Sequence, residues 1–265
     1  MAYNNYHMHT TFCDGGNTAE EMVQACIAAG CEEVGFSGHS YLPFDDEWTM
    51  VPEQAAAYRA EVKRLAEVYK DQISIRLGIE QDLCSPTDEL GEYEYNIGAV
   101  HCLFKDGNYV SIDLDVETLQ KCIQDYYGGD PYALVEHYYE EVSKVYEKTH
   151  CQIIAHFDLV TKFLERGIGI DLNHQRYVAA ADRALEVLMK TPAAFEINTG
   201  AISRGYRHEP YPDERILAKL GEAGAKVILS SDSHSVDTVV YDFDNAMKLV
   251  EKYGLNLVTS IDELL

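Results

Sequence analysis

Short apolar runs alternate with longer amphipathic stretches over most of the chain. The apolar runs are rich in Val, Ile, Phe and Ala, which is typical of buried strands, and they lie at residues 33–38, 73–79, 96–100, 152–155, 194–197 and 226–230. Residues 3–9, which end in Tyr6-His7-Met8-His9, predict one further strand at the start. The amphipathic stretches predict helices at residues 18–29, 53–69, 116–126, 131–148, 173–189, 213–223 and 244–253.

Strands and helices therefore alternate about seven times, and this pattern favours a parallel sheet. Polar groups directly after successive strands favour a barrel, because the carboxyl ends of parallel strands form one rim. A hairpin is expected at residues 103–113, with its turn at Asp106-Gly107-Asn108. We find no linker and no fixed-period repeat, so we expect a single α/β domain over residues 1–265 with the architecture of a TIM-like barrel.

Composition narrows the class of protein. The chain has 265 residues, of which 46% are hydrophobic. We see neither a signal peptide nor an apolar stretch long enough to cross a membrane, which predicts a soluble, cytoplasmic protein. Seven cysteines without a C-x-x-C pair predict reduced thiols. The formal net charge of −24 argues against a nucleic-acid partner, and an acidic protein that handles phosphate would need bound cations.

The candidate chemistry lies at the strand ends. His7 and His9 should share one face of the first strand, because strand side chains alternate with a period of two. Further histidines and carboxylates follow the later strands, at His39, Glu80, His101, His156, Asp232 and His234. Asp14 is an additional candidate in the loop after the first strand. Imidazoles combined with carboxylates suit Zn, Mn or Fe, and this set is large enough for two to three divalent metal ions.

The motifs resemble those of the PHP (polymerase and histidinol phosphatase) domain family. The resemblance rests on His7-Met-His9-Thr-Thr-Phe-Cys-Asp14, Gly35-Phe-Ser-Gly-His39-Ser-Tyr, Gly78-Ile-Glu80, Gly98-Ala-Val-His101, Ile154-Ala-His156-Phe-Asp158 and Ser231-Asp232-Ser-His234. It implies a distorted (β/α)7 barrel with a trinuclear metal centre. The implied ligand sets are His7, His9, Glu80 and Asp232 for the first ion, Glu80, His101 and His156 for the second, and His39 and His234 for the third. Asp14 stands where many relatives have a histidine.

Within the family, Phe36-Ser-Gly-His39-Ser, Gly98-Ala-Val-His101 and Glu196-Ile-Asn-Thr199 resemble stand-alone histidinol-phosphate phosphatases. The resemblance implies hydrolysis of L-histidinol phosphate by a metal-activated hydroxide, in histidine biosynthesis. Glu80, Asp232 and His234 are then the candidate catalytic residues.

Several rim residues are candidates for contact with the substrate. Arg204 and Arg207 lie in the loop after the sixth strand and offer planar donors to a phosphate, with Lys162 and Arg166 as second choices. A cationic substrate end would suit an acidic group, and the candidates are Glu196, Asp82, Asp45 and Asp46, with Tyr41 as an aromatic wall.

Other functions remain open at this point. The chain could act on another small phosphoester or nucleotide, or as a metal-dependent amidohydrolase, a class that also begins with His-x-His. Glu80 and the terminal Asp232-Ser-His234 favour the phosphoesterase. A catalytically silent metal-binding domain is a further alternative. We expect a small-molecule phosphomonoester as the partner, with neither nucleic acid nor membrane, and the sequence leaves the oligomeric state open.

Overall fold

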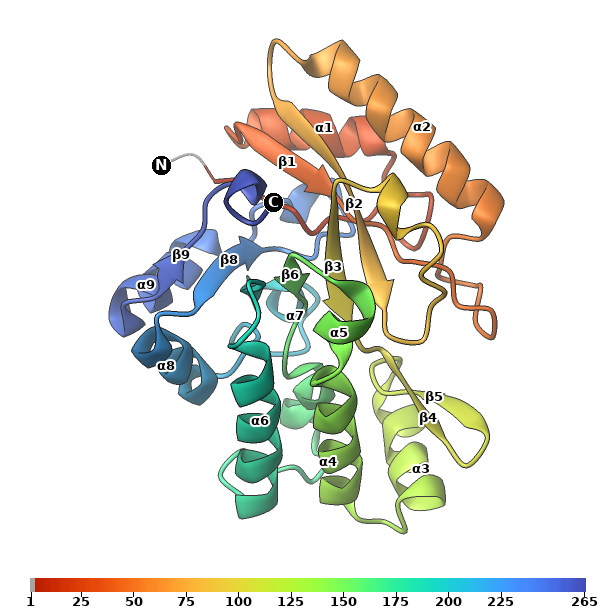
Figure 1. Ribbon diagram of the computed structural model, residues 1–265, viewed down its shortest axis with the longest axis vertical. Coiled ribbons are helices and arrows are strands. Elements are labelled where there is room, and N and C mark those ends of the chain that lie inside the picture. Colours follow the sequence, from red (N-terminus) through yellow and green to blue (C-terminus); the bar gives the residue numbers. More distant parts are fainter. Residues whose placement is uncertain (1–2) are drawn as a thin grey trace.

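Seven parallel strands form a curled sheet at the centre of the molecule (Figure 1). The computed structural model describes residues 3–265, and within it the strand order is β1-β2-β3-β6-β7-β8-β9. These strands are β1 (Glu33–Phe36), β2 (Ser74–Asp82), β3 (Tyr95–Ala99), β6 (Ile153–Ile154), β7 (Ala194–Asn198), β8 (Lys226–Ser230) and β9 (Asn256–Leu257). Every residue of β1, β3, β6 and β7 is buried, as expected for parallel strands covered on both faces.

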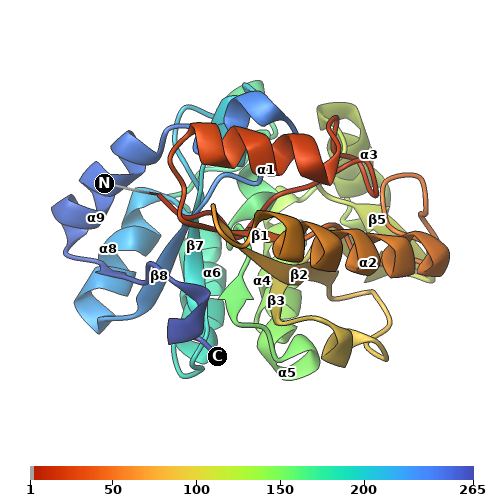
Figure 2. The same ribbon diagram turned by 90° about the horizontal axis from the view of Figure 1, so that it is seen from above.

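Helices surround the sheet and leave one rim for the loops (Figure 1). Both views place α1 beside α2, next to β1 and β2, and α8 beside α9, next to β8 (Figure 2). The helices are α1 (Ala19–Ala28), α2 (Pro52–Tyr69), α3 (Val116–Tyr126), α4 (Pro131–Val142), α5 (Val145–Thr149), α6 (Gln175–Leu188), α7 (Gly200–Ser203), α8 (Glu214–Ala223) and α9 (Phe243–Tyr253). A capping box begins α1, since Thr18 and Glu21 bond each other's backbone amides.

The segment predicted as the first strand differs from the expectation. Within residues 3–9 there are only isolated bridges, from Asn5 to Val34 and from Met8 to Ser233. The segment nevertheless bonds to both flanks of the sheet, because the Ser37 amide donates to the Met8 carbonyl (3.0 Å) and the His9 amide donates to the Ser233 carbonyl (2.8 Å). The seventh strand of the sheet is instead β9, in a segment for which the sequence analysis predicted neither a helix nor a strand.

Smaller differences concern element ends. The stretch 131–148 was expected to form one helix, but it is divided into α4 and α5. Strand β2 continues past residue 79, so Glu80 lies inside the strand rather than after it. The hairpin is confirmed: β4 (Cys102–Lys105) pairs antiparallel with β5 (Asn108–Ser111) across a turn with positive φ at Asp106 and Gly107. The α/β fold with a curled parallel sheet is therefore confirmed, whereas the strands do not form a fully closed barrel.

Aromatic and aliphatic side chains from the N-terminal segment and from β3, β6, β7 and β8 form one buried cluster. The side chain of Tyr95 lies over Gly35 and Gly78. A Cβ would come within 2.2 Å of the Tyr95 hydroxyl at Gly35 and within 2.2 Å of the Tyr95 ring at Gly78. Its hydroxyl donates to the carbonyls of Tyr6 (2.6 Å) and Phe36 (3.2 Å). This ring therefore ties the N-terminal segment to β1 and β2.

Two broader expectations concern cysteines and membrane spans. All seven cysteines are unpaired within residues 3–265, as predicted, and five of them are buried: Cys26, Cys31, Cys102, Cys122 and Cys151. Among the described helices, none combines the length and the apolar character that a bilayer crossing requires.

Candidate metal centre

Glu80 is the central residue of the site. The residue is 1% exposed, and its side chain is fully buried. Each of its oxygens faces imidazole nitrogens: Oε2 lies 3.2 Å from His7 Nε2, 3.5 Å from His9 Nε2 and 2.8 Å from His39 Nδ1, and Oε1 lies 3.3 Å from His101 Nε2 and 3.0 Å from His156 Nε2. A carboxylate placed in this way can bridge two ions.

The N-terminal segment presents two imidazoles to Glu80. Met8, which lies between them in sequence, packs the opposite way into the cluster that contains Val34 and Phe36. The predicted alternation of side chains therefore holds, although the segment is not a regular strand. His39 reaches the same carboxylate because it forms a parallel bridge with Glu80, which continues the pairing of β1 with β2.

Asp232 closes the site from the end of β8. Its φ of 48° lies in the left-handed region, which is uncommon for a residue with a side chain. Its Oδ1 lies 3.3 Å from His9 Nε2, while its Oδ2 accepts from Arg204 Nη2 (2.9 Å). Gly200 makes room for this pair, since a Cβ there would come within 2.8 Å of the Asp232 side chain.

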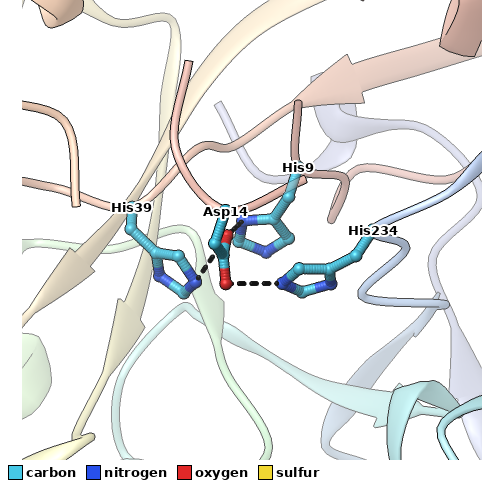
Figure 3. Close-up of side chains that lie close together, drawn as sticks. All are labelled: His9, Asp14, His39 and His234. Carbon is cyan, nitrogen blue, oxygen red and sulfur yellow. Dashed lines mark hydrogen bonds and ion pairs between the residues drawn. The ribbon is translucent and has the colours of Figure 1, made fainter. Parts of the chain in front are cut away.

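Asp14 is surrounded by imidazoles from three segments, as Figure 3 shows. Its Oδ1 lies 3.7 Å from His9 Nδ1 and 3.6 Å from His39 Nε2, and its Oδ2 lies 3.1 Å from His234 Nε2. The loop can carry Asp14 to this position because it turns tightly onto the backbone of residues 9 and 10, where a Cβ on Gly15 would clash. A carboxylate thus occupies the middle of this cluster.

The structure brings all nine predicted ligands around one centre. Three groups have ligand atoms within 4.8 Å of one another: His7, His9 and Asp232; His39, Glu80 and His101; and His9, Asp14, His39 and His234. The first and third groups resemble the expected sets. The second contains His39 where His156 was expected, although His156 also contacts Glu80. Because His9 and His39 each belong to two groups, the three positions are contiguous.

Two buried carboxylates hold the imidazoles from behind. Glu196 Oε1 lies 2.6 Å from His7 Nδ1, and Asp82 Oδ2 lies 3.1 Å from His101 Nδ1. Asp82 also accepts from the backbone amides of His101 (2.8 Å) and Cys84 (2.6 Å). A carboxylate on one ring nitrogen keeps the proton there and turns the other nitrogen's lone pair toward the centre.

The donor set fits divalent ions. Among the described residues, His7 Nε2, His9 Nε2 and Glu80 Oε2 are buried side-chain atoms without a hydrogen-bond partner. Buried polar atoms are normally satisfied, and these three converge on the same point. Neutral imidazole nitrogens and a carboxylate are the ligands that Zn, Mn and Fe accept.

The electrostatic field of the site is strong. Burial acts to raise the pKa of Glu80, but the surrounding imidazoles outweigh it and hold that pKa well below its ordinary value. Burial acts to lower the pKa of His39, but Glu80 and Asp14 raise it to about 9. Burial and the neighbouring imidazoles of His234 and His39 lower the pKa of His9 to about 3.

A cavity of about 440 Å³ opens above the centre. Its walls include Asp14, His39, Glu80, His101, His156, Arg204, Asp232 and His234, together with Asp45, Glu47, Trp48, Ser111, Asp113, Lys162 and Tyr206. Trp48 and Asp113 were not among the predicted site residues. The sequence held a signal for both, since the only tryptophan lies nine residues after His39 and the hairpin of Asp113 directly follows His101.

Six of the predicted substrate contacts do not line this cavity: Arg207, Arg166, Glu196, Asp82, Asp46 and Tyr41. Arg207 is 4% exposed and is buried against Asp158 (3.5 Å) and Thr161 (2.8 Å). Tyr41 lines a separate cavity of about 290 Å³ with Met50, Ile79 and Tyr93. Glu196 lies beneath His7. None of Arg207, Tyr41 and Glu196 lines the cavity above the metal centre, whereas Arg204 does reach it.

A family model described as the PHP domain matches residues 5–200. The chain belongs to the PHP domain family. This confirms the resemblance seen in the motifs. Among curated PHP domain relatives, a probable histidinol-phosphatase of Schizosaccharomyces pombe is 28% identical over 97% of this chain and 89% of its own. A histidinol-phosphatase of Bacillus subtilis is 25% identical over 90% of this chain and 96% of its own.

Solved structures show the same fold. The Listeria monocytogenes protein hisK, to which histidinol phosphatase activity is ascribed, has a TM-score of 0.82 at 22% identity and covers 91% of this chain and 99% of its own. The histidinol phosphate phosphatase of Lactococcus lactis, in a complex with zinc, L-histidinol and phosphate, has a TM-score of 0.68 at 21% identity, over 97% and 95% of the two chains. The fold of these two structures thus covers at least 91% of this chain.

Proposed function

We propose that the protein is a metal-dependent phosphomonoesterase that hydrolyses L-histidinol phosphate to L-histidinol and phosphate. The observation that carries the proposal is the carboxylate of Glu80, which contacts five imidazoles at the floor of an open cavity. Membership of the PHP domain family and the histidinol-phosphatases among its relatives support the reaction and the substrate.

The proposed ligands are the nine residues around Glu80. His7, His9 and Asp232 would hold one ion with one oxygen of Glu80, and the other oxygen would bridge toward His101 and His156. Asp14, His39 and His234 would complete a third position. Ions held there would neutralise phosphate oxygens and acidify a water molecule.

The chain's own cations would orient the phosphate. Arg204 lines the cavity while its guanidinium is fixed by the carbonyl (2.8 Å) and the carboxylate (2.9 Å) of Asp232. Lys162 lines it as well and is held by the Asp113 carbonyl at 2.6 Å. Fixed positive groups of this kind stabilise the charge on a transferring phosphoryl group without reorganising. His234, which is partly exposed on the cavity wall, is the candidate for proton transfer to the leaving oxygen.

The finer points of architecture and location belong to the same proposal. We regard the fold as a distorted (β/α)7 barrel of one domain, in which the N-terminal segment lies in the place of a strand between β1 and β8. A cytoplasmic location and the absence of nucleic-acid partners stay predictions.

The test is phosphate release from L-histidinol phosphate by protein loaded with Zn²⁺ or Mn²⁺, compared with a panel of other phosphomonoesters, phosphodiesters and small nucleotides. We expect a strong preference for histidinol phosphate, and we expect His101→Ala to abolish it. Turnover of a different phosphoester in preference to histidinol phosphate would keep the metal centre and refute the substrate.

A further inference from the structure

The cavity above the metal centre separates its charged groups by position in the fold. Lys162 follows β6 and Arg204 follows β7, whereas Asp45 and Glu47 lie on the loop between β1 and α2. In the strand order β1-β2-β3-β6-β7, these loops leave the sheet at points several strands apart. The carboxylates of the β1–α2 loop therefore lie on a different part of the wall from the two cations.

The cations and the carboxylates of the β1–α2 loop also differ in their ion-pair partners. Arg204 is paired with Asp232 and Lys162 with Asp113. Asp45 and Glu47, by contrast, form no ion pair with any residue in the described range 3–265. Two uncompensated negative charges in a chain of net charge −24 would repel an ordinary phosphate. Their place on the cavity wall is explained if the ligand carries a positive charge at its other end.

Trp48 connects this acidic loop to the centre. Its ring centroid lies 4.6 Å from that of His39 and 5.4 Å from that of His101, nearly perpendicular to both rings. The indole is thus held beside the metal ligands, and it also lines the cavity. An indole wall next to carboxylates suits a cation or a flat heteroaromatic ring.

We propose that the β1–α2 loop determines substrate specificity, with Asp45 and Glu47 recognising a cationic group on the alcohol part of the phosphomonoester and Trp48 packing against its body. This inference rests on the proposed function, and it assigns the end of the cavity beside the β1–α2 loop to the alcohol part of the substrate. The phosphate lies at the metal centre with Arg204 and Lys162, and the ammonium group points toward the acidic loop.

The test compares two substrates that differ in one charge. L-histidinol phosphate carries an ammonium group, and 3-(imidazol-4-yl)propyl phosphate lacks it. The variant Asp45→Asn/Glu47→Gln keeps the shapes of both side chains and removes their charges. We expect kcat/KM for histidinol phosphate to fall roughly 2- to 5-fold for each charge removed, mostly through KM, while kcat/KM for the analogue without the ammonium group stays the same or rises.

Asp46→Asn is the matched control, because Asp46 is an exposed carboxylate of the same loop that is not among the described cavity residues. The Asp46→Asn variant should have the same ratio of kcat/KM values for the two substrates as the wild-type protein. Calorimetric titration with L-histidinol measures the same contact without turnover. The affinity for L-histidinol should be lower in the double variant than in the wild-type protein, and added salt should weaken wild-type binding. Zinc content should be equal in all three proteins.

The outcomes separate the two proposals. Wild-type protein could hydrolyse histidinol phosphate while the double variant loses kcat/KM equally for both substrates, or for neither substrate. Either result would overturn the specificity inference and leave the proposed function standing. If wild-type protein prefers other aminoalkyl phosphates, such as phosphoethanolamine, and loses that preference in the double variant, the function is refuted and the inference stands. Preference for an anionic or neutral phosphoester refutes both.

Discussion

Replacing Glu196 by Gln should weaken metal binding without touching a proposed metal ligand. The Glu196 carboxylate accepts three hydrogen bonds, from His7 Nδ1 (2.6 Å), the His156 amide (3.0 Å) and Asn198 Nδ2 (3.0 Å). Glutamine has one accepting oxygen and one donating NH₂ group. Either orientation of the amide therefore sets a donor against a donor or changes the tautomer of His7.

The expected losses of metal affinity and of stability follow from these two orientations of the glutamine amide. If the NH₂ group faces His7 Nδ1, the ring proton moves to Nε2, which points at Glu80 from 3.2 Å and then has no lone pair for an ion. If it faces His156 and Asn198 instead, two buried donors lose their acceptor, at about 1–3 kcal/mol each. Loss of such a partner behind a ligand typically weakens metal affinity about 10- to 100-fold.

The assay is zinc content after dialysis against graded concentrations of a chelator, together with urea unfolding of the metal-free protein. Glu186→Gln, on the exposed face of α6, is the control and should change neither quantity. A direct substrate role for Glu196 makes the opposite prediction, namely a raised KM with unchanged zinc affinity. Glu196→Gln protein that keeps zinc affinity within about twofold and full stability would refute our reasoning.

Three further outcomes follow from buried groups. Arg207→Met should destabilise the protein by about 3–5 kcal/mol near neutral pH, measured by urea unfolding. Burial raises the pKa of Asp158 to about 6 even with Arg207 beside it, so the loss should be smaller at pH 5, where the carboxyl is protonated. Because the pKa of His39 is raised to about 9, the metal-free ring is protonated at neutral pH and must release that proton to bind an ion. Apparent zinc affinity should thus rise between pH 7 and 8.5, and a flat profile after correction for the chelator would contradict this. Gly78→Ala should lower the melting temperature, since its Cβ would lie 2.2 Å from the Tyr95 ring and overpacking of this kind costs about 1–3 kcal/mol.

Two surface substitutions serve as controls for these stability measurements. Gly91→Ala adds a Cβ with no described atom within 4 Å, so it should leave the melting temperature almost unchanged. Arg64→Met removes an exposed pair with Glu61, and such pairs contribute about 0–1 kcal/mol. If Arg64→Met and Arg207→Met lower the free energy of unfolding equally, burial does not make the Arg207 ion pair more important for stability than an exposed pair.

The metal centre could be predicted from the sequence because its chemistry coincides with the end of each apolar run. His101 and Asp232 directly follow recognisable strands, and parallel strands bring such residues to one rim. The prediction of a regular first strand was wrong, but the prediction that His7 and His9 share one face of the segment was correct. Alternation of side chains depends only on an extended backbone, not on a complete ladder of hydrogen bonds.

The surroundings of the centre could not be predicted in the same way. Arg204 lies closer than Arg207 to the Asn198-Thr199-Gly200 turn, which favours Arg204 for the phosphate. Both arginines nevertheless lie in one predicted loop, and only the fold buries Arg207 beside Asp158. Glu196 was expected to face the substrate because it lies near a strand end. Whether such a carboxylate faces the cavity or the back of an imidazole depends on the neighbouring strand, which in this structure places His156 beside it.

The ligands of the centre are spread from residue 7 to residue 234, and this spacing has a consequence for biogenesis. A ribosome releases the first histidines long before Asp232 and His234 exist, so a growing chain offers only incomplete sets of donors. High-affinity capture of metal must therefore wait until the last strands have joined the sheet. Metal loading would then mark complete synthesis, and a truncated chain that ends before residue 232 would be left as a metal-poor target for proteolysis.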